Sequence, residues 1–149
     1  MKNRDSSCND HWETPQSFYN GINKEFSFDF DPCPLNHNID EWDGLEVEWG
    51  HRNFINPPYS LNLKKAFVLK GIEEYKKGKL CVFLLPVSTS TKLFHEYILP
   101  HNPEIRFLKG RLRFSGTNSR GEYVTNKTGQ HDSMLIIFDG RENSSGGFC

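Results

Sequence analysis

The fold of this chain is decided by the unbroken apolar stretch Leu80-Cys81-Val82-Phe83-Leu84-Leu85. Six apolar residues in a row, without polar alternation, are typical of a parallel strand that is covered on both faces. A helix is expected before this strand, because Ser60 can cap a segment in which Val68 and Ile72 lie on one face. A covered strand next to a helix predicts an α/β fold.

Apolar periodicity and turn residues place the other elements around this strand. Helices and strands alternate early in the chain and strands dominate later, which indicates an α/β fold with a mixed β-sheet. We expect one domain over residues 1–149, with residues 1–10 flexible and loops over 32–50 and 115–130. The further elements predicted are a helix that Thr14 caps and Pro15 begins, a strand over 26–31, a short strand over 53–56, a helix from Ser90 or Thr91 to Leu99, and strands over 105–108, 111–114 and 134–138.

The composition limits the class of protein. The chain has 149 residues, 36% hydrophobic and 25% charged, as in globular proteins that bury a core. No apolar run approaches the roughly 20 residues that a membrane-spanning helix needs, and no signal peptide is expected at the N-terminus. No metal site is expected, because Cys33 and His37 lack a second pair of ligands. A reducing cytoplasm is indicated by four scattered cysteines, Cys8, Cys33, Cys81 and Cys149.

Charge is distributed unevenly along the chain, although the net charge is only −1. Residues 1–60 contain eleven acidic and four basic residues. Residues 106–127 contain six basic residues and one acidic residue. This distribution fits a protein that contacts nucleic-acid phosphates with one face, and a merely solvated basic loop is the alternative.

The most distinctive motif is Asn56-Pro57-Pro58-Tyr59, which directly follows a short predicted strand. Each proline fixes its own φ and restricts the residue before it, so the corner is rigid. It therefore holds two acceptors in place, the side-chain carbonyl of Asn56 and the backbone carbonyl of Pro57. Tyr59 adds a flat face for stacking. The motif suits an amino group on an aromatic or amide plane, and an ordinary turn after a strand is the alternative.

Two earlier motifs suit the amino-acid end of a ligand. In His11-Trp12-Glu13-Thr14-Pro15, a hydroxyl and free backbone N–H groups at a helix start suit a carboxylate. Asp31 stands at the end of a predicted strand, before Pro32-Cys33-Pro34, and can accept a hydrogen bond from an ammonium group. The alternative interpretations are an ordinary helix cap and a turn aspartate.

A third motif, Lys109-Gly110-Arg111-Leu112-Arg113-Phe114, combines basic and aromatic residues ahead of a polar loop. Its cations can reach phosphates, and the polar residues behind it can reach base edges. We expect residues 106–131 to form a nucleic-acid-contacting region. Its candidate contact residues are Lys109, Arg111, Arg113, Asn118, Arg120, Lys127 and His131.

The order of these motifs resembles that of the short phage-type DNA N6-adenine methyltransferases. The resemblance spans roughly residues 10–138, and His-Asp-Ser-Met at residues 131–134 is the last motif in the series. It implies a reduced Rossmann-like fold, S-adenosylmethionine as the methyl donor, and adenine in duplex DNA as the acceptor. It also implies that a base flipped out of the duplex is clamped at its amino nitrogen by Asn56, Pro57, Pro58 and Tyr59.

The resemblance also assigns the methyl donor to the two earlier motifs. Thr14 and Asp31 would hold the amino-acid end of S-adenosylmethionine. One departure is that Pro32-Cys33-Pro34-Leu35 stands where a Gly-x-Gly loop is usual. The neighbouring cofactor contacts would be Trp12, Pro15, Pro32 and Cys33. The candidates for contacts to the ribose hydroxyls are Asp40, Glu41 and Asp43.

Two other functions stay open at this stage. The same corner can serve a base in RNA or a glutamine amide in a protein as the methyl acceptor. A non-catalytic protein that keeps the fold to bind DNA or a cofactor is the other alternative, and the shortened cofactor region favours it. In each case we expect a monomer or homodimer without membrane contact.

Overall fold

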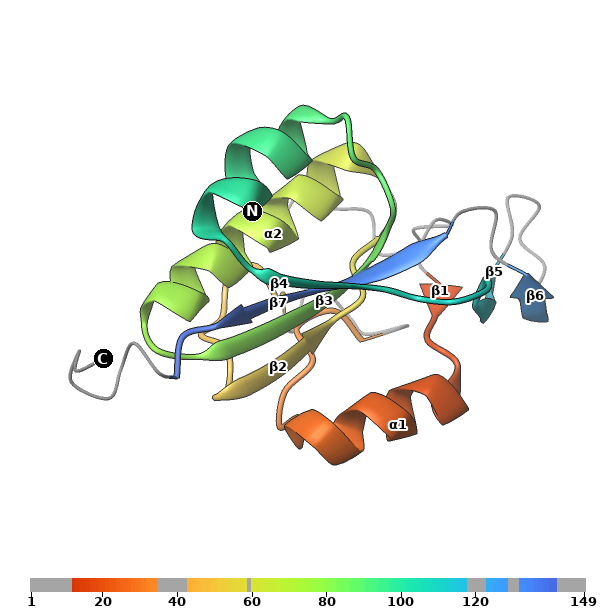
Figure 1. Ribbon diagram of the computed structural model, residues 1–149. Coiled ribbons are helices and arrows are strands. Elements are labelled where there is room, and N and C mark those ends of the chain that lie inside the picture. The colour runs from red at the N-terminus through yellow and green to blue at the C-terminus, as the bar shows by residue number, and fades with distance from the viewer. Residues whose placement is uncertain (1–11, 35–42, 59, 118–122, 129–131, 142–149) are drawn as a thin grey trace.

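The computed structural model describes a four-stranded sheet with helices on both faces and a three-stranded sheet at one end (Figure 1). None of the helices in the described part has the length and apolar character needed to cross a membrane. The described residues are 12–34, 43–58, 60–117, 123–128 and 132–141.

The four-stranded sheet is mixed, as the sequence predicts. Its strands, in order across the sheet, are β2 (Arg52–Ile55), β3 (Leu80–Pro86), β7 (Ser133–Asp139) and β4 (Glu104–Phe107). β2 and β3 are parallel, with Phe54 opposite Val82, and β7 is antiparallel to both β3 and β4. The predicted buried strand is confirmed, because every residue from Leu80 to Leu85 is buried. It is parallel to its neighbour on one side only.

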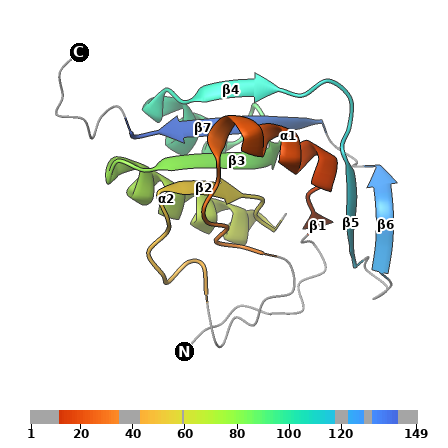
Figure 2. The same cartoon turned by 90° about the horizontal axis from the view of Figure 1, so that it is seen from below.

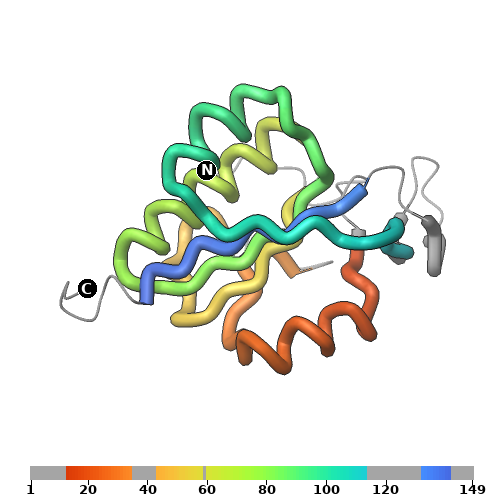
Figure 3. The backbone as a smooth tube through the Cα atoms, in the orientation of Figure 1, coloured from red at the N-terminus to blue at the C-terminus, as the bar shows by residue number. Residues whose placement is uncertain are grey.

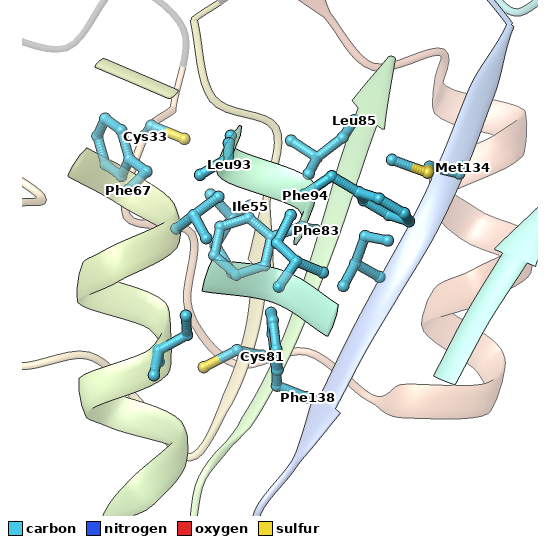
Figure 4. Close-up of a cluster of buried hydrophobic side chains, with 14 of the residues drawn as sticks. Cys33, Ile55, Phe67, Cys81, Phe83, Leu85, Leu93, Phe94, Met134 and Phe138 are labelled. Atoms are coloured by element: carbon cyan, nitrogen blue, oxygen red, sulfur yellow. The ribbon is translucent and has the colours of Figure 1, made fainter. Parts of the chain in front are cut away.

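Helices form a layer on each side of this sheet (Figure 3). α2 (Leu61–Lys76) and the π-helix η1 (Leu93–Ile98) cover one face, and α1 (Gln16–Phe26) covers the other (Figure 1). Alternate residues of β3 serve the two cores, so that Phe83 packs with Phe67 on one face and Val82 packs with Phe26 on the other. Figure 4 shows the first of these cores.

The strand predicted over 26–31 is wrong in extent. Phe26 ends α1, and Ser27 leaves the helix with a left-handed φ of 53°. Few residues remain for pairing, and Phe30 forms an isolated parallel bridge with Asn53 of β2. The segment still runs beside β2, because the Phe54 N–H donates to the Phe30 carbonyl at 3.0 Å. Asp31 and Asn56 therefore follow neighbouring parallel segments.

The loop predicted over 115–130 is also wrong. β5 (Arg113–Thr117) and β6 (Tyr123–Thr128) form an antiparallel pair with a register shift between Phe114 and Gly116. β1 (Trp12–Glu13) pairs antiparallel with β5, with Glu13 opposite Ser115. Glycines and polar residues hide these strands from a search for apolar alternation. Figure 2 shows this sheet at the end of the molecule toward which β4 points.

The helix predicted from Ser90 or Thr91 is confirmed in place but differs in type. The π-helix η1 continues into a 3₁₀ turn, η2 (Leu99–His101), and Pro100 lies within that turn. Thr91 lies just before η1, and its Oγ1 accepts a hydrogen bond from the Phe94 N–H at 3.2 Å. Ser60 stands at the N-cap position of α2 but makes no side-chain capping hydrogen bond.

Candidate functional site

Three segments that are distant in sequence meet where β2 ends. Asn56 follows β2, the segment Asp31–Cys33 follows the Phe30 bridge, and Thr14 lies between β1 and α1. Asn56 is 7% exposed. Open α/β sheets bind ligands outside the carboxyl ends of their strands, and these segments occupy that position.

A hydrogen bond joins Asn56 to Thr14. The Nδ2 of Asn56 donates to the Thr14 Oγ1 at 3.0 Å, across 42 positions of sequence. With its nitrogen on the hydroxyl, the amide directs its carbonyl oxygen away from Thr14. The prediction that Thr14 caps α1 is wrong, because Pro15 takes the N-cap position and no side chain caps the helix. The hydroxyl contacts the corner instead.

The backbone of the corner is held by the second segment. The Sγ of Cys33 donates to the backbone carbonyl of Asn56 at 3.3 Å, and the Asp31 Oδ1 accepts from the Cys33 N–H at 2.9 Å. Pro32 and Cys33 are both buried. Figure 4 shows Cys33 beside Phe67 at the edge of the core. The Cys33 thiol therefore helps to hold the backbone of the corner in place, a role that its position in the sequence does not indicate.

Asp31 combines an exposed residue surface with a shifted carboxyl group. Loss of solvation by surrounding protein atoms raises the pKa of this carboxyl to about 6, and the hydrogen bond from the Cys33 N–H opposes the rise. Within the described residues, no ion pair with a cation is found at Asp31. A carboxylate that is ionised at neutral pH and reaches the surface suits a cationic ligand group.

Asp43 takes a position that the sequence does not predict. It is 4% exposed, and its Oδ1 accepts from the Leu45 N–H at 2.9 Å. The next residue packs against Pro32, since a Cβ added to Gly44 would lie 1.6 Å from the Pro32 carbonyl oxygen. Asp43 therefore shapes a turn behind the second segment, and its contact with a ribose stays a prediction. Asp40 and Glu41 lie outside the described residues.

The basic region is attached to this site by the β1–β5 pairing, directly before Thr14. Lys109, Arg111 and Arg113 are exposed. The Arg111 Nε lies 3.4 Å from the Asp132 Oδ1 at the surface. The predicted contacts that lie outside the described residues are Asn118, Arg120, His131 and Tyr59, together with the side chains of Lys127 and Trp12.

Arg106, the first residue of the predicted region over 106–131, is paired with two acidic side chains. Its Nη1 and Nη2 each donate to Glu25 at 2.7 Å, and its Nε donates to Glu104. These hydrogen bonds raise the pKa of the Arg106 guanidinium further. Arg106 therefore ties α1 to β4.

A hollow of about 290 Å³ lies at the opposite end of the sheet, near the amino ends of β3 and β4. Its charged lining groups pair with one another, Arg106 with Glu25 and Arg141 with Asp139, the latter at 2.8 Å. Among the described residues, no group of three or more His, Cys, Asp or Glu could hold a metal ion. The site that ends β2 is therefore the stronger candidate.

Comparison with protein families identifies the family of the chain. A family model described as DNA N-6-adenine-methyltransferase (Dam) matches residues 2–145. The match contains all three converging segments. No curated protein sequence matches the chain.

Proposed function

The chain belongs to the DNA N-6-adenine-methyltransferase (Dam) family, and we propose that it methylates the exocyclic N6 amino group of adenine in DNA with S-adenosylmethionine as donor. One observation supports the donor and the site most directly. Thr14, the segment Asp31–Cys33 and Asn56 converge at the carboxyl end of β2.

The corner accounts for the acceptor side of the reaction. The adenine amino nitrogen is a poor nucleophile, because its lone pair is delocalised into the ring. The Oδ1 of Asn56 and the backbone carbonyl of Pro57 accept hydrogen bonds from the two N–H groups of this nitrogen. These hydrogen bonds favour the positively charged, sp³-like transition state. Pro58 keeps the corner rigid, and Tyr59 stacks on a base that has left the duplex. Positioning supplies most of the rate enhancement.

Two groups of opposite character fit the amino-acid end of S-adenosylmethionine. Thr14 is half-buried and its hydroxyl can donate to a carboxylate, and the carboxylate of Asp31, a residue with exposed surface, can accept from an ammonium group. When bound, the cofactor supplies an electrophilic methyl group on a sulfonium. We assign the remaining walls of its pocket to Trp12, Pro15, Pro32, Cys33 and Asp43, in a reduced Rossmann-like domain.

The basic region accounts for the nucleic acid. Lys109, Arg111 and Arg113 lie close in sequence, are exposed, and bind the phosphates on either side of the target. Polar residues of the β5–β6 sheet reach the bases. We include Asn118, Arg120, Lys127 and His131 in this surface. The protein acts in the cytoplasm, where thiols such as those of Cys33 and Cys81 stay reduced, as a monomer or homodimer.

Labelled methyl transfer tests this function. The purified protein is incubated with tritiated S-adenosylmethionine and, in parallel, with unmethylated duplex DNA, RNA or a glutamine-containing protein. The expected result is label in DNA alone, recovered after digestion as N6-methyladenine. Label in RNA or in protein would show that the acceptor is RNA or protein and not DNA. Absence of calorimetric binding of S-adenosylhomocysteine would contradict a methyl-transfer function and favour a non-catalytic binding protein.

A further inference from the structure

We propose that Thr14 is a positioning residue that couples binding of the methyl donor to the orientation of the Asn56 side chain, an inference that rests on the proposed function. A hydroxyl carries one proton and two lone pairs, so it can accept one hydrogen bond while it donates another. The Thr14 Oγ1 accepts from the Nδ2 of Asn56 at 3.0 Å. Its proton is left to donate elsewhere.

The Thr14 hydroxyl can donate its proton in a hydrogen bond to a bound ligand. No hydrogen bond donated by the Thr14 hydroxyl is found within the described residues, and Thr14 is only half-buried. The carboxylate of an amino-acid ligand is a stronger acceptor than water or an amide. When the methyl donor binds through this carboxylate, the Thr14 hydroxyl therefore donates its hydrogen bond to the carboxylate.

Engagement of the proton restricts the amide of Asn56. A side-chain amide can rotate by half a turn and exchange its oxygen and nitrogen. In the exchanged orientation Oδ1 faces the Thr14 Oγ1, which is favourable only if the Thr14 proton points at it. Once the Thr14 proton is hydrogen-bonded to the methyl donor, the Asn56 Oδ1 and the Thr14 Oγ1 would face each other as two acceptors with no proton between them. Donor binding thus selects the orientation in which Nδ2 faces Thr14 and Oδ1 faces the target amino group.

The backbone on both sides of the Asn56 side chain is held in place. The backbone carbonyl of Asn56 is held by the Cys33 thiol at 3.3 Å, and Pro57 fixes the chain after it. The residue before Thr14 is paired with β5. Because coupling between two ligands is reciprocal, the donor raises the affinity for the extruded adenine as much as adenine raises the affinity for the donor.

Two substitutions separate this role from simple cofactor binding. Thr14→Val removes the hydroxyl and keeps the shape, and Thr14→Ser keeps the hydroxyl. We expect Thr14→Val to lower kcat by about tenfold at saturating S-adenosylmethionine, and Thr14→Ser to stay within about threefold of wild type. Thr91→Val is a matched control, since the Thr91 hydroxyl accepts from the Phe94 N–H and donates to the Ser88 carbonyl, outside the proposed site. A Thr14→Val variant in which only the KM for the donor rises, with kcat unchanged, would overturn the coupling.

A second readout does not depend on the acceptor. The side-chain amide protons of Asn56, identified by their absence in Asn56→Ala, are followed by ¹⁵N NMR during titration with S-adenosylhomocysteine. We expect the cofactor product to slow their exchange with water in wild type and Thr14→Ser but not in Thr14→Val. Equal slowing in all three would overturn the coupling. If the wild type does not methylate DNA but shows this pattern, the coupling stands and the proposed acceptor fails.

Discussion

The two ends of the parallel pair β2 and β3 are built from different polar interactions. At the amino end, the fully buried Glu74 carboxylate is bound by Lys79, by Lys77 at 3.0 Å and by the Trp49 N–H at 3.1 Å. At the carboxyl end, Asn56 and Thr14 are joined by a neutral hydrogen bond. A buried ion pair cannot lose a partner without a large penalty, whereas a neutral amide and hydroxyl can exchange partners.

Two carboxyl groups show the difference most clearly. Burial alone would raise the pKa of Glu74, but hydrogen bonds from Lys79, Lys77 and the Trp49 N–H outweigh it and lower the pKa. At Asp31 the loss of solvation dominates and the pKa rises to about 6. Glu74 has cationic partners within the fold, whereas Asp31 is suited to a cationic group of a ligand. The amino end therefore stabilises the fold, and the carboxyl end fits the proposed binding and reaction.

The largest expected effect is on catalysis. Asn56→Ala removes an acceptor of the target amino group and should lower kcat by about a thousandfold. The affinity for S-adenosylhomocysteine, measured by calorimetry, should change by less than about threefold, since the loss is electrostatic and local. Asn62→Ala, at an exposed position of α2, is the control. Loss of folding and of cofactor binding in Asn56→Ala would make Asn56 a structural turn residue.

The next effect is on stability and belongs to the amino end. Glu74→Gln leaves the buried Lys79 with only the exposed Glu48 as an anionic partner and should lower the free energy of unfolding by about 3 kcal/mol, with kcat unchanged. The exposed neighbour Glu73→Gln should change it by less than about 0.5 kcal/mol. Urea denaturation at pH 7 measures both.

The same variant has a pH signature. The folded-state pKa of Glu74 is lowered, so its contribution is present above the unfolded pKa near 4.3 and is lost as pH falls toward the folded value. The difference in stability between wild type and Glu74→Gln should therefore shrink below about pH 4. A constant difference from pH 7 to pH 3 would show that the ion pair is not its origin.

A third effect comes from the turn behind the donor site. A Cβ at Gly44 would lie 1.6 Å from the Pro32 carbonyl oxygen, whereas a Cβ at Gly21 in α1 would meet nothing within 4 Å. Gly44→Ala should destabilise by about 2 kcal/mol and weaken S-adenosylhomocysteine binding. Gly21→Ala should stabilise by about 0.5 kcal/mol without affecting binding. Similar thermal shifts for the two variants would contradict the close packing of Gly44 on Pro32.

The fourth effect is the pH dependence of donor binding. In the proposed site the ammonium group of the methyl donor pairs with the ionised Asp31, so the affinity for the methyl donor should fall by about tenfold per pH unit below about pH 6. Asp31→Asn should bind S-adenosylhomocysteine more weakly at pH 7.5 and lose this dependence. Because the raised folded pKa makes the charged form unfavourable above it, Asp31→Asn should also unfold at a higher temperature at pH 7. An unchanged pH dependence in the variant would exclude Asp31 as the titrating group.

The smallest effect concerns DNA and separates two arginines. Arg111→Gln should reduce the salt slope of DNA binding by about one, because its guanidinium is exposed. Arg106→Gln should leave the slope unchanged and reduce stability by less than about 1 kcal/mol, because Arg106 is held by Glu25 and Glu104 at the surface. Fluorescence anisotropy from 50 to 200 mM salt measures the slopes. Equal slopes for both variants would contradict the division.

Local features of the fold and site could be predicted, and long-range ones could not. The buried strand from Leu80 and the corner after β2 are encoded in consecutive residues, so apolar runs and prolines reveal them. The Thr14–Asn56 hydrogen bond spans 42 positions and leaves no pattern in either segment. The β1–β5 pairing involves two residues of β1, too few for periodicity. Arg106 has the right charge for DNA, but its pairing with Glu25 spans 81 positions and leaves no pattern in the sequence.

The most direct test maps where the cofactor product binds. ¹⁵N NMR of the ligand-free protein during titration with S-adenosylhomocysteine should shift the backbone signals of Thr14, Cys33 and Asn56 most. Signals of Glu74 and Lys79 should stay in place. Shifts concentrated instead around His101, Arg106 and Arg141, which line the hollow at the amino end, would place the site at the wrong end of the sheet and contradict the account.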